Sequence, residues 1–142
     1  MTGAFIDTNM FVSVANKKDQ DHKRAVRLFD RIRKGEFGQP YTSDYVFDEA
    51  LTVTLMRTRR LESAVNVGKL ILGSKREAIP ALARLIRVDE RIFSESWRVF
   101  QSGKLKGLSF TDHTILSQIK EYQLEYVISL DRDFDGLVAR IE

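Results

Sequence analysis

The sequence alternates short apolar runs with longer stretches in which apolar residues recur at helical spacing, and this alternation restricts the fold more than any other feature. Short apolar runs bounded by turn residues are typical of buried strands. Strands separated by helices need crossover connections, so they form a parallel sheet with helices on both faces. The sequence therefore predicts an α/β fold, a three-layer α/β/α sandwich around a mainly parallel sheet of about five short strands.

The boundaries of these elements follow from capping residues and glycines. We expect strands over residues 4–6, 40–42, 85–88, 126–130 and 138–141. We expect one helix capped by Asn9, a second from Asp21 to near Gly35, and a third from Ser43 to about Arg59. Further helices are expected over 62–72, after a cap at Asp89, and from Ser109 onward. The segment 74–82 has no clear pattern. Because no linker or repeat interrupts the chain, residues 1–142 are expected to form a single domain.

Composition excludes several kinds of site. The chain has no cysteine, so disulfides and thiolate metal ligands are excluded. Its two histidines, His22 and His113, lack zinc-like spacing. No apolar run approaches the roughly 20 residues of a membrane span, and Asp7 interrupts any export signal. The expected compartment is the cytoplasm, with no membrane partner.

The net charge is +3 and the pI about 9.3, which is compatible with an anionic partner such as nucleic acid. Basic side chains outside any acidic site could bind a phosphate backbone. The candidates are Lys17, Lys18, Lys23, Arg24, Arg57, Arg59, Arg60, Lys104 and Lys106.

Two of the expected strands end directly in an aspartate, Asp7 and Asp131. Parallel strands bring such ends to one edge of the sheet, where ligands of open α/β sheets bind. The alternative is that each aspartate only starts a turn or caps a helix. Asp133 competes with Asp131 and is a possible further ligand. The neighbouring Thr8, Asn9 and Ser129 could orient the carboxylates or bind a metal-bound water.

Two further acids lie on the expected helices. Asp112 precedes Ile115, Leu116 and Ile119 at offsets that share a helix face, so it points along the buried stripe. A capping box with Ser109 is the alternative, but this motif favours Glu or Gln, so we favour a functional role.

On a helical wheel, Glu49 lies between Tyr45 and Met56 on one side and Val46 and Val53 on the other. An unpaired carboxylate there costs several kcal/mol unless a cation offsets it. Asp44 and Asp48 fall together on another arc near Arg59 and are interpreted as a solvated face.

Asp7, Glu49, Asp112 and Asp131 thus form a candidate set of metal-binding and catalytic carboxylates. Hard cations such as Mg²⁺ and Mn²⁺ prefer carboxylate oxygens. A metal held in this way can activate water and stabilise charge on a phosphoryl group. An acidic pocket in a basic protein is therefore consistent with cleavage of an anionic phosphodiester.

At these residues the sequence resembles the PIN-domain ribonucleases, and within them the VapC-type toxins. The matching segments, in order, are Ile6-Asp7-Thr8-Asn9, 42–49, 108–112 and 128–134. The resemblance implies Mg²⁺- or Mn²⁺-dependent cleavage of RNA, a homodimer, and a cognate antitoxin protein for the toxin branch. The family's acidic positions correspond to Asp7, Glu49, Asp112 and Asp131. The family often has Thr at the position of Ser129, and the hydroxyl is retained.

Other functions remain to be weighed. A phosphatase of the haloacid dehalogenase type needs a second Asp two residues after Asp7, where this chain has Asn9. A receiver-like domain needs a pair of acids at the end of the first strand. A housekeeping RNA-processing PIN nuclease, or a catalytically silent PIN-like module that binds RNA or protein, are the closer alternatives.

Overall fold

A computed structural model describes residues 3–142, and its centre is a five-stranded sheet with the order β3-β2-β1-β4-β5, in which every neighbouring pair is parallel. The strands are β1 (Gly3–Ile6), β2 (Gln39–Ser43), β3 (Arg84–Ile86), β4 (Tyr126–Ile128) and β5 (Ala139–Ile141). The helices are α1 (Thr8–Ala15), α2 (His22–Arg33), α3 (Asp44–Thr58), α4 (Leu61–Leu72), α5 (Glu90–Ser102) and α6 (Phe110–Glu121). The predicted parallel α/β architecture is confirmed.

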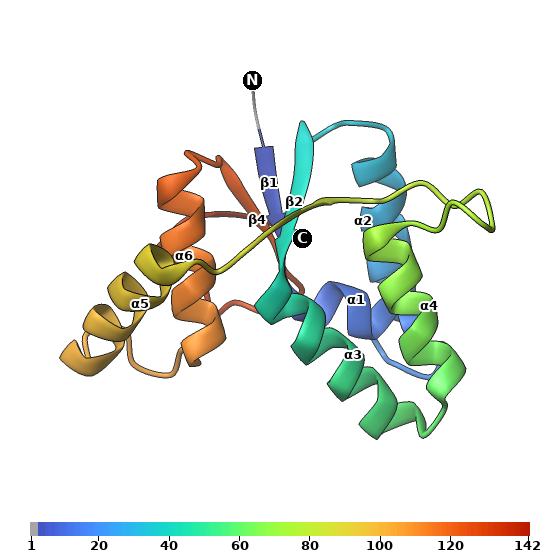
Figure 1. The fold of residues 1–142 in the computed structure, drawn as a ribbon, viewed down its shortest axis with the longest axis horizontal. Helices are drawn as coiled ribbons and strands as arrows, with labels where there is room; N and C mark the ends of the chain where they lie inside the picture. The colour runs from blue at the N-terminus through green and yellow to red at the C-terminus, as the bar shows by residue number, and fades with distance from the viewer. Residues whose placement is uncertain (1–2) are drawn as a thin grey trace.

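The helices divide between the two faces of the sheet. Helices α1–α4 cover one face, and α5 and α6 cover the other (Figure 1). This division follows from the crossovers, because β1, β2 and β3 are joined along one face whereas the chain returns to β4 along the other. Within residues 3–142, no helix has the length and apolar character needed to cross a membrane.

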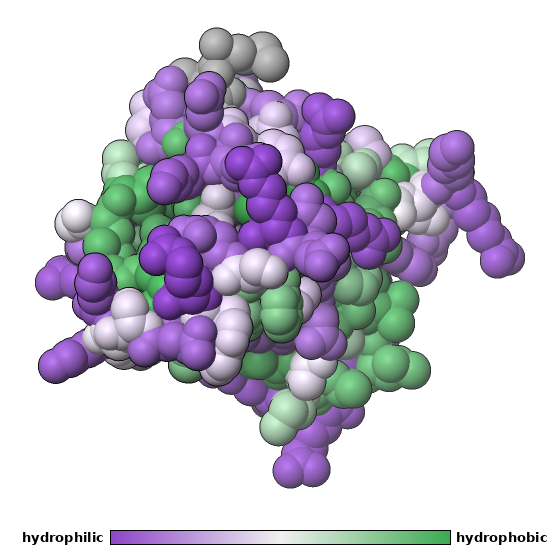
Figure 2. Space-filling model, turned by 60° about the vertical axis from the view of Figure 1, so that its left-hand side comes forward, coloured by the Kyte–Doolittle hydropathy of each residue, from purple (hydrophilic) through white to green (hydrophobic). Residues whose placement is uncertain are grey.

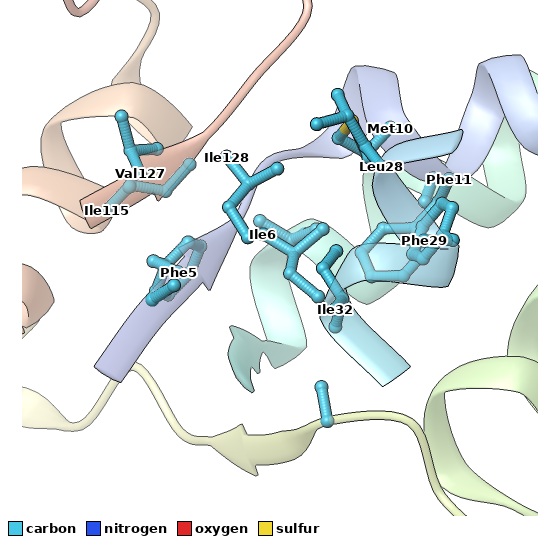
Figure 3. Packing of buried hydrophobic residues seen from close by; sticks show 14 of the residues in the cluster. Phe5, Ile6, Met10, Phe11, Leu28, Phe29, Ile32, Ile115, Val127 and Ile128 are labelled. Carbon is cyan, nitrogen blue, oxygen red and sulfur yellow. The ribbon is translucent and has the colours of Figure 1, made fainter. Parts of the chain in front are cut away.

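The core lies where the sheet meets both helical layers. Phe5 and Ile6 of β1 pack with Ile128 of β4, and Phe11 of α1 contacts Phe29 of α2 with ring centroids 5.7 Å apart (Figure 3). Both central strands are buried along almost their whole length, as expected for a parallel sheet with helices on both faces. The core therefore holds the carboxyl ends of β1 and β4 in a fixed position.

Most predicted helix boundaries are correct within one or two residues. Ser43 and Asp89 cap their helices as expected, each accepting a hydrogen bond from a backbone N–H three residues on. The prediction for Asn9 is wrong, since α1 begins at Thr8 and Asp7 is the cap. The side chain of Asn9 is thereby available for other contacts.

The unassigned segment 74–82 forms a tight turn closed by a bridge between Ser74 and Ile79. Gly73 precedes it with φ +75°, and a Cβ there would lie 2.7 Å from the backbone nitrogen of Ala81. Only glycine fits such a position, so Gly73 both ends α4 and allows the turn.

Candidate functional site

The candidate site lies at the carboxyl ends of β1 and β4, the point where the sheet reverses its strand order. The chain leaves β1 into α1, whereas the described residues between β4 and β5 form a loop without a helix. Ligands of open α/β sheets bind at such a switch point. Ile6 of β1 is paired with Ile128 of β4, and the backbone N–H of Asp7 donates to the carbonyl of Ile128 at 3.0 Å. Asp7 is therefore fixed beside the residues that follow β4.

Asp7 is the most buried acid of the site, with 5% of its surface exposed. Its Oδ1 accepts from the backbone N–H of Thr8 at 2.7 Å, and its Oδ2 accepts from the Ser129 hydroxyl at 2.8 Å. Burial raises the pKa of Asp7 to about 7, and the nearby Asp112 and Asp131 add to the rise, while the hydrogen bond from Ser129 opposes it. The predicted contact between Ser129 and a strand-end aspartate is present.

Asn9 connects the two strand ends. Its Nδ2 lies 2.8 Å from Asp131 Oδ2, 3.0 Å from Ser129 Oγ and 3.3 Å from Asp7 Oδ2. Its Oδ1 accepts from the backbone N–H of Leu130 at 3.0 Å. One side chain from α1 thus positions both aspartates, as the sequence suggested when it placed Asn9 beside the acids.

Asp131 belongs to a loop rather than to the end of a strand, because β4 ends at Ile128 and not at residue 130 as predicted. The loop is nevertheless anchored. Arg24 donates to the carbonyl of Leu130 and Arg140 to the carbonyl of Ser129, each at 3.1 Å. The anchoring role of both arginines was not predicted, since their partners are remote in sequence or in a different element and no local pattern reveals them.

Asp133 lies close to Asp131. Its backbone N–H donates to Asp131 Oδ1 at 3.0 Å. Partial burial and the negative charges of Asp131 and Asp112 raise the pKa of the Asp133 carboxyl. Asp133 therefore adjoins the same group of acids as Asp131.

Asp112 forms the capping box that the sequence analysis considered the weaker alternative. Ser109 Oγ accepts from the N–H of Asp112, and Asp112 Oδ2 accepts from the N–H of Ser109, both at 3.0 Å. Asp is long enough to close the box because the reach spans a single turn. Burial raises the pKa of Asp112, and the charges of Glu49 and Asp131 raise it further. The carboxylate of Asp112 therefore both caps α6 and belongs to the group of acids at the site.

Glu49 lies on α3 across from Asp112, and its side chain is half-buried. The prediction that Glu49 lies between apolar, buried residues is wrong on one side, because 70% of the surface of Met56 is exposed. Glu49 lines an open hollow together with Asp44, Asp48 and Thr111. Its carboxylate thus lies at the margin of the buried face.

The interpretation of Asp44 as part of a solvated face near Arg59 is also wrong. Asp44 Oδ1 accepts from the backbone N–H of Val88 at 2.9 Å and thereby fixes the segment that leads from β3 into α5. Asp48 is exposed, as predicted. Glu49 differs from Asp44 in making no hydrogen bond with the described residues, but all three acids line the same hollow.

The five acids have no basic partner: within residues 3–142, no Lys, Arg or His forms an ion pair with Asp7, Glu49, Asp112, Asp131 or Asp133. In the same part of the chain, no three His, Asp or Glu side chains are placed to hold one ion together. The buried hydroxyl of Thr8 has no hydrogen-bond partner. The site is thus a group of mutually repelling oxygen ligands that a cation could draw together.

Aromatic side chains flank the helical side of this site. Phe110, two residues before Asp112, contacts Tyr45 of α3 and Phe93 and Phe100 of α5. Phe93, Trp97 and Phe100 are 46%, 49% and 40% exposed. In Figure 2, hydrophobic residues are interleaved with hydrophilic ones on the side of the molecule that carries α5 and α6.

Two of the predicted basic candidates lie near the acids. Arg57 lines a shallow pocket with Asn9 and Asp131, and Arg24 supports the loop that carries Asp131. Arg60 pairs with Glu62 instead. The other candidates are exposed, and no contact links them to the acids among the residues described: Lys17, Lys18, Lys23, Arg59, Lys104 and Lys106.

Comparison with known proteins gives a consistent result. The model of the PIN domain family matches residues 4–138. A sequence search of curated proteins gave no match. Among solved structures, the chain is similar to Mycobacterium tuberculosis VapC20, described as a toxin that cleaves the sarcin-ricin loop, with TM-score 0.78, 22% identity, and coverage of 94% of this chain and 93% of that one.

Two protein complexes are also similar in fold. Rickettsia felis VapBC2, bound to a DNA fragment from its promoter, gives TM-score 0.65 at 12% identity, covering 99% of this chain and 98% of that one. Neisseria gonorrhoeae FitAcB gives TM-score 0.58 at 18% identity, covering 98% and 96%. At such identities the likeness concerns the fold.

Proposed function

The chain belongs to the PIN domain family, and from this premise we propose that it is a ribonuclease that hydrolyses phosphodiester bonds of RNA with the help of Mg²⁺ or Mn²⁺. The observation that carries the proposal is the group of five acids at the switch point of the sheet, none of which is neutralised by a basic side chain within residues 3–142. Acids kept together at such a cost in repulsion are typical of a cation site.

The donor types of these residues suit a hard divalent cation, whose binding would draw the carboxylates closer together than they lie in the structure. Asp7, Glu49, Asp112 and Asp131 would hold it, with Asp133 as a possible further ligand and with Thr8, Asn9 and Ser129 orienting them. Apart from the Asn9 amide nitrogen, the polar side-chain atoms of these residues are all oxygens, which hard cations prefer as ligands. The chain has no cysteine that would favour a softer metal. When bound, the cation would supply an activated water and stabilise the negative charge that develops on the phosphoryl group.

The chain's own residues provide the geometry for this reaction. Ser129 and Asn9 hold the carboxylate of Asp7 in one orientation, and the capping box holds that of Asp112. Glu49 lines an open hollow, so its carboxylate remains accessible to a cation that arrives from solvent. The site thus combines acids held in place with an acid that is free to adapt to a cation.

We further propose that the protein is the toxin of a toxin–antitoxin pair, that it forms a homodimer and that a cognate antitoxin blocks its site. The support is the similarity in fold to VapC20, a toxin, and to a toxin–antitoxin complex from Klebsiella pneumoniae. A housekeeping RNA-processing nuclease would share the fold and the acids, so the two roles differ only in partner.

The ribonuclease proposal is tested by incubating structured RNA with the protein in Mg²⁺, in Mn²⁺ and in EDTA. Wild type is expected to cut with either metal and not in EDTA. Asp7→Asn should lower cleavage by at least about 10³-fold, because it removes a buried ligand charge. Asp30→Asn, an exposed acid on α2, is the control and should cut normally. Cleavage that persists in EDTA, or that is equal in Asp7→Asn, contradicts the proposal.

The toxin role is tested by expressing the chain with the adjacent reading frame. A small protein that co-purifies with it and suppresses cleavage supports the toxin. A chain that purifies alone, does not arrest growth and still cleaves RNA is a housekeeping nuclease. A chain that binds RNA but cleaves none in either metal is a silent binding module.

A further inference from the structure

A pocket lined by arginines lies directly beside the loop of Asp131. Arg24, Arg27 and Arg31 follow one another along one face of α2, and Arg132 joins them from the loop. Leu130 forms the floor, and Glu142 is the one acid among the lining residues. Four guanidinium groups and one carboxylate line this hollow, and Asp21 and Glu36 outside it pair with Arg24 and Arg31, so the excess positive charge lies mainly on Arg27 and Arg132.

The arginines of this pocket differ in how firmly they are held. Arg24 is fixed by the carbonyl of Leu130, and Arg31 pairs with Glu36 at 2.7 Å. Arg27 and Arg132 are exposed, and neither forms an ion pair with any residue between 3 and 142. The pocket therefore combines positioned guanidinium groups with free ones, whose donors are available to an anion.

Glu142 shows that the pocket accepts an anion. Its Oε2 lies 3.1 Å from Nη2 of Arg24 and 2.8 Å from Nη1 of Arg140. The Arg140 side chain is only 7% exposed, whereas 54% of the Glu142 side chain is exposed, so a buried guanidinium group helps to hold a carboxylate that stays open to solvent. A phosphate oxygen has the same charge and accepting geometry as a carboxylate oxygen.

The pocket is continuous with the acidic site. Leu130 lines both this pocket and the neighbouring one, which is formed with Asn9, Asp131 and Arg57. A chain of phosphates that passes Asp131 would therefore reach the arginines next. On the other side of the site, the hollow lined by Asp44, Asp48 and Glu49 is acidic and would repel a phosphate.

We propose that the pocket of Arg24, Arg27, Arg31 and Arg132 binds phosphate groups of the RNA backbone on one side of the cleaved bond, an inference that rests on the proposed ribonuclease function. Guanidinium groups bind phosphates through paired hydrogen bonds as well as charge. The substrate thus extends from the acids toward α2 and not toward the acidic hollow of α3. Glu142 occupies part of the pocket until RNA displaces it.

The binding test uses a fluorescently labelled single-stranded RNA in EDTA, so that it is not cut. Arg27→Gln combined with Arg132→Gln should weaken binding about tenfold and reduce the slope of log affinity against log salt by about 1.4, since two phosphate contacts are lost. Arg84→Gln combined with Arg87→Gln removes the same charge at β3, the opposite edge of the sheet. Equal weakening by both pairs overturns the proposal.

Glu142→Gln should change the affinity for RNA in the opposite direction. Removing this carboxylate should tighten RNA binding about threefold, because Arg24 and Arg140 lose a competing anion. Glu125→Gln, an exposed acid without an ion pair in the described chain, is the matched control for net charge. Thermal unfolding of each variant checks that the fold is intact. Binding by Glu142→Gln that is no tighter than that of Glu125→Gln overturns the proposal.

Cleavage kinetics separate this inference from the proposed function. With Mg²⁺, the Arg27 and Arg132 double variant should raise KM about tenfold and leave kcat unchanged, since neither side chain belongs to the acidic site. If RNA is cut but both arginine double variants weaken RNA binding equally, the pocket proposal is contradicted and the ribonuclease proposal is retained. If no variant cuts RNA but only the pocket variants lose RNA binding, the ribonuclease proposal is contradicted and the pocket proposal is retained. Weakened binding of a co-purifying protein, with RNA binding unchanged, overturns the pocket proposal.

Discussion

The two halves of the acidic site are built in different ways. On the strand side, Asp7 and Asp131 are joined by Asn9 and Ser129 through hydrogen bonds of 2.8–3.3 Å that connect α1 with the loop after β4. On the helix side, Asp112 bonds only within its own capping box, and no side chain or backbone group between residues 3 and 142 donates to Glu49. One half is a network, and the other consists of separate acids.

This difference indicates that the two halves of the site contribute differently to folding stability and to function. A network in which each member restrains the others fixes the position of a ligand and contributes to folding stability. An acid without partners contributes little to stability and can adapt to a cation or a substrate. Substitutions in the two halves should therefore separate stability from activity, with the largest effects on stability in the strand half.

Asn9→Ala should cause the largest loss of stability. It removes the contacts with Asp7, Ser129, Asp131 and the backbone of Leu130 and leaves the part-buried N–H of Leu130 without its acceptor, so we expect a loss of about 2–4 kcal/mol in the free energy of unfolding. Urea denaturation in EDTA measures it. Asn66→Ala, an exposed residue of α4, should cost nothing. A loss below 1 kcal/mol for Asn9→Ala would mean that the network does not join the strand ends.

Asp7→Asn should abolish cleavage and yet stabilise the metal-free protein at pH 8. The pKa of Asp7 rises from 3.8 to about 7 on folding, so folding takes up a proton between these values and wild type loses stability as the pH increases through this window. The variant lacks this loss and should be more stable by about 1–3 kcal/mol at pH 8, with a smaller gain at pH 5. Denaturation in EDTA at the two pH values tests this, and a gain independent of pH contradicts it.

Substitutions of Asp112 should divide its two roles. Asp112→Asn keeps an oxygen that can accept from the N–H of Ser109, so stability should change little while cleavage is lost. Asp112→Ala removes the reciprocal half of the capping box and should cost about 1 kcal/mol in addition. Equal unfolding free energies for the two variants would show that the cap adds nothing to the helix.

Glu49→Gln should have the smallest effect on stability, less than about 0.5 kcal/mol, because the side chain is half-buried and makes no hydrogen bond with the described residues. Cleavage with Mg²⁺ should nevertheless fall by about 10²-fold or more, as expected for a lost metal ligand. Asp48→Asn, at the preceding position of α3, is the control and should retain activity. A large loss of stability in Glu49→Gln would place this acid in the network after all.

Much of the site could be predicted from the sequence because its acids coincide with local signals. Asp7 follows a buried strand, and Asp112 lies three residues after a capping serine, so both positions are encoded within a few residues. The position of Glu49 was predicted from a helical wheel, yet Tyr45 on that side of α3 contacts Phe110 whereas Met56 is 70% exposed. A wheel describes one helix and contains no information about which neighbours cover it.

Contacts between remote segments were harder to predict. Asn9 was expected to cap a helix and to be able to orient a carboxylate; it does not cap α1, and it joins the end of β1 to the loop after β4, 120 residues from Ser129. Asp44 was expected on a solvated face, but it bonds to Val88. Arg24, known from the sequence only as one basic residue among many, supports Leu130 and lines a pocket with three other arginines. Each of these roles depends on a partner that the fold supplies.

By itself, the sequence determined the order of strands and helices, their parallel arrangement and the acids that meet at the sheet edge, because periodicity and capping act over a few neighbouring residues. Only the tertiary structure decided that Asn9 and Ser129 bind the two aspartates of the strand half into one network, that Glu49 remains apart, and that arginines gather beside Asp131. The physical reason is that burial and side-chain hydrogen bonds are set by which remote segments pack together, which no local pattern records.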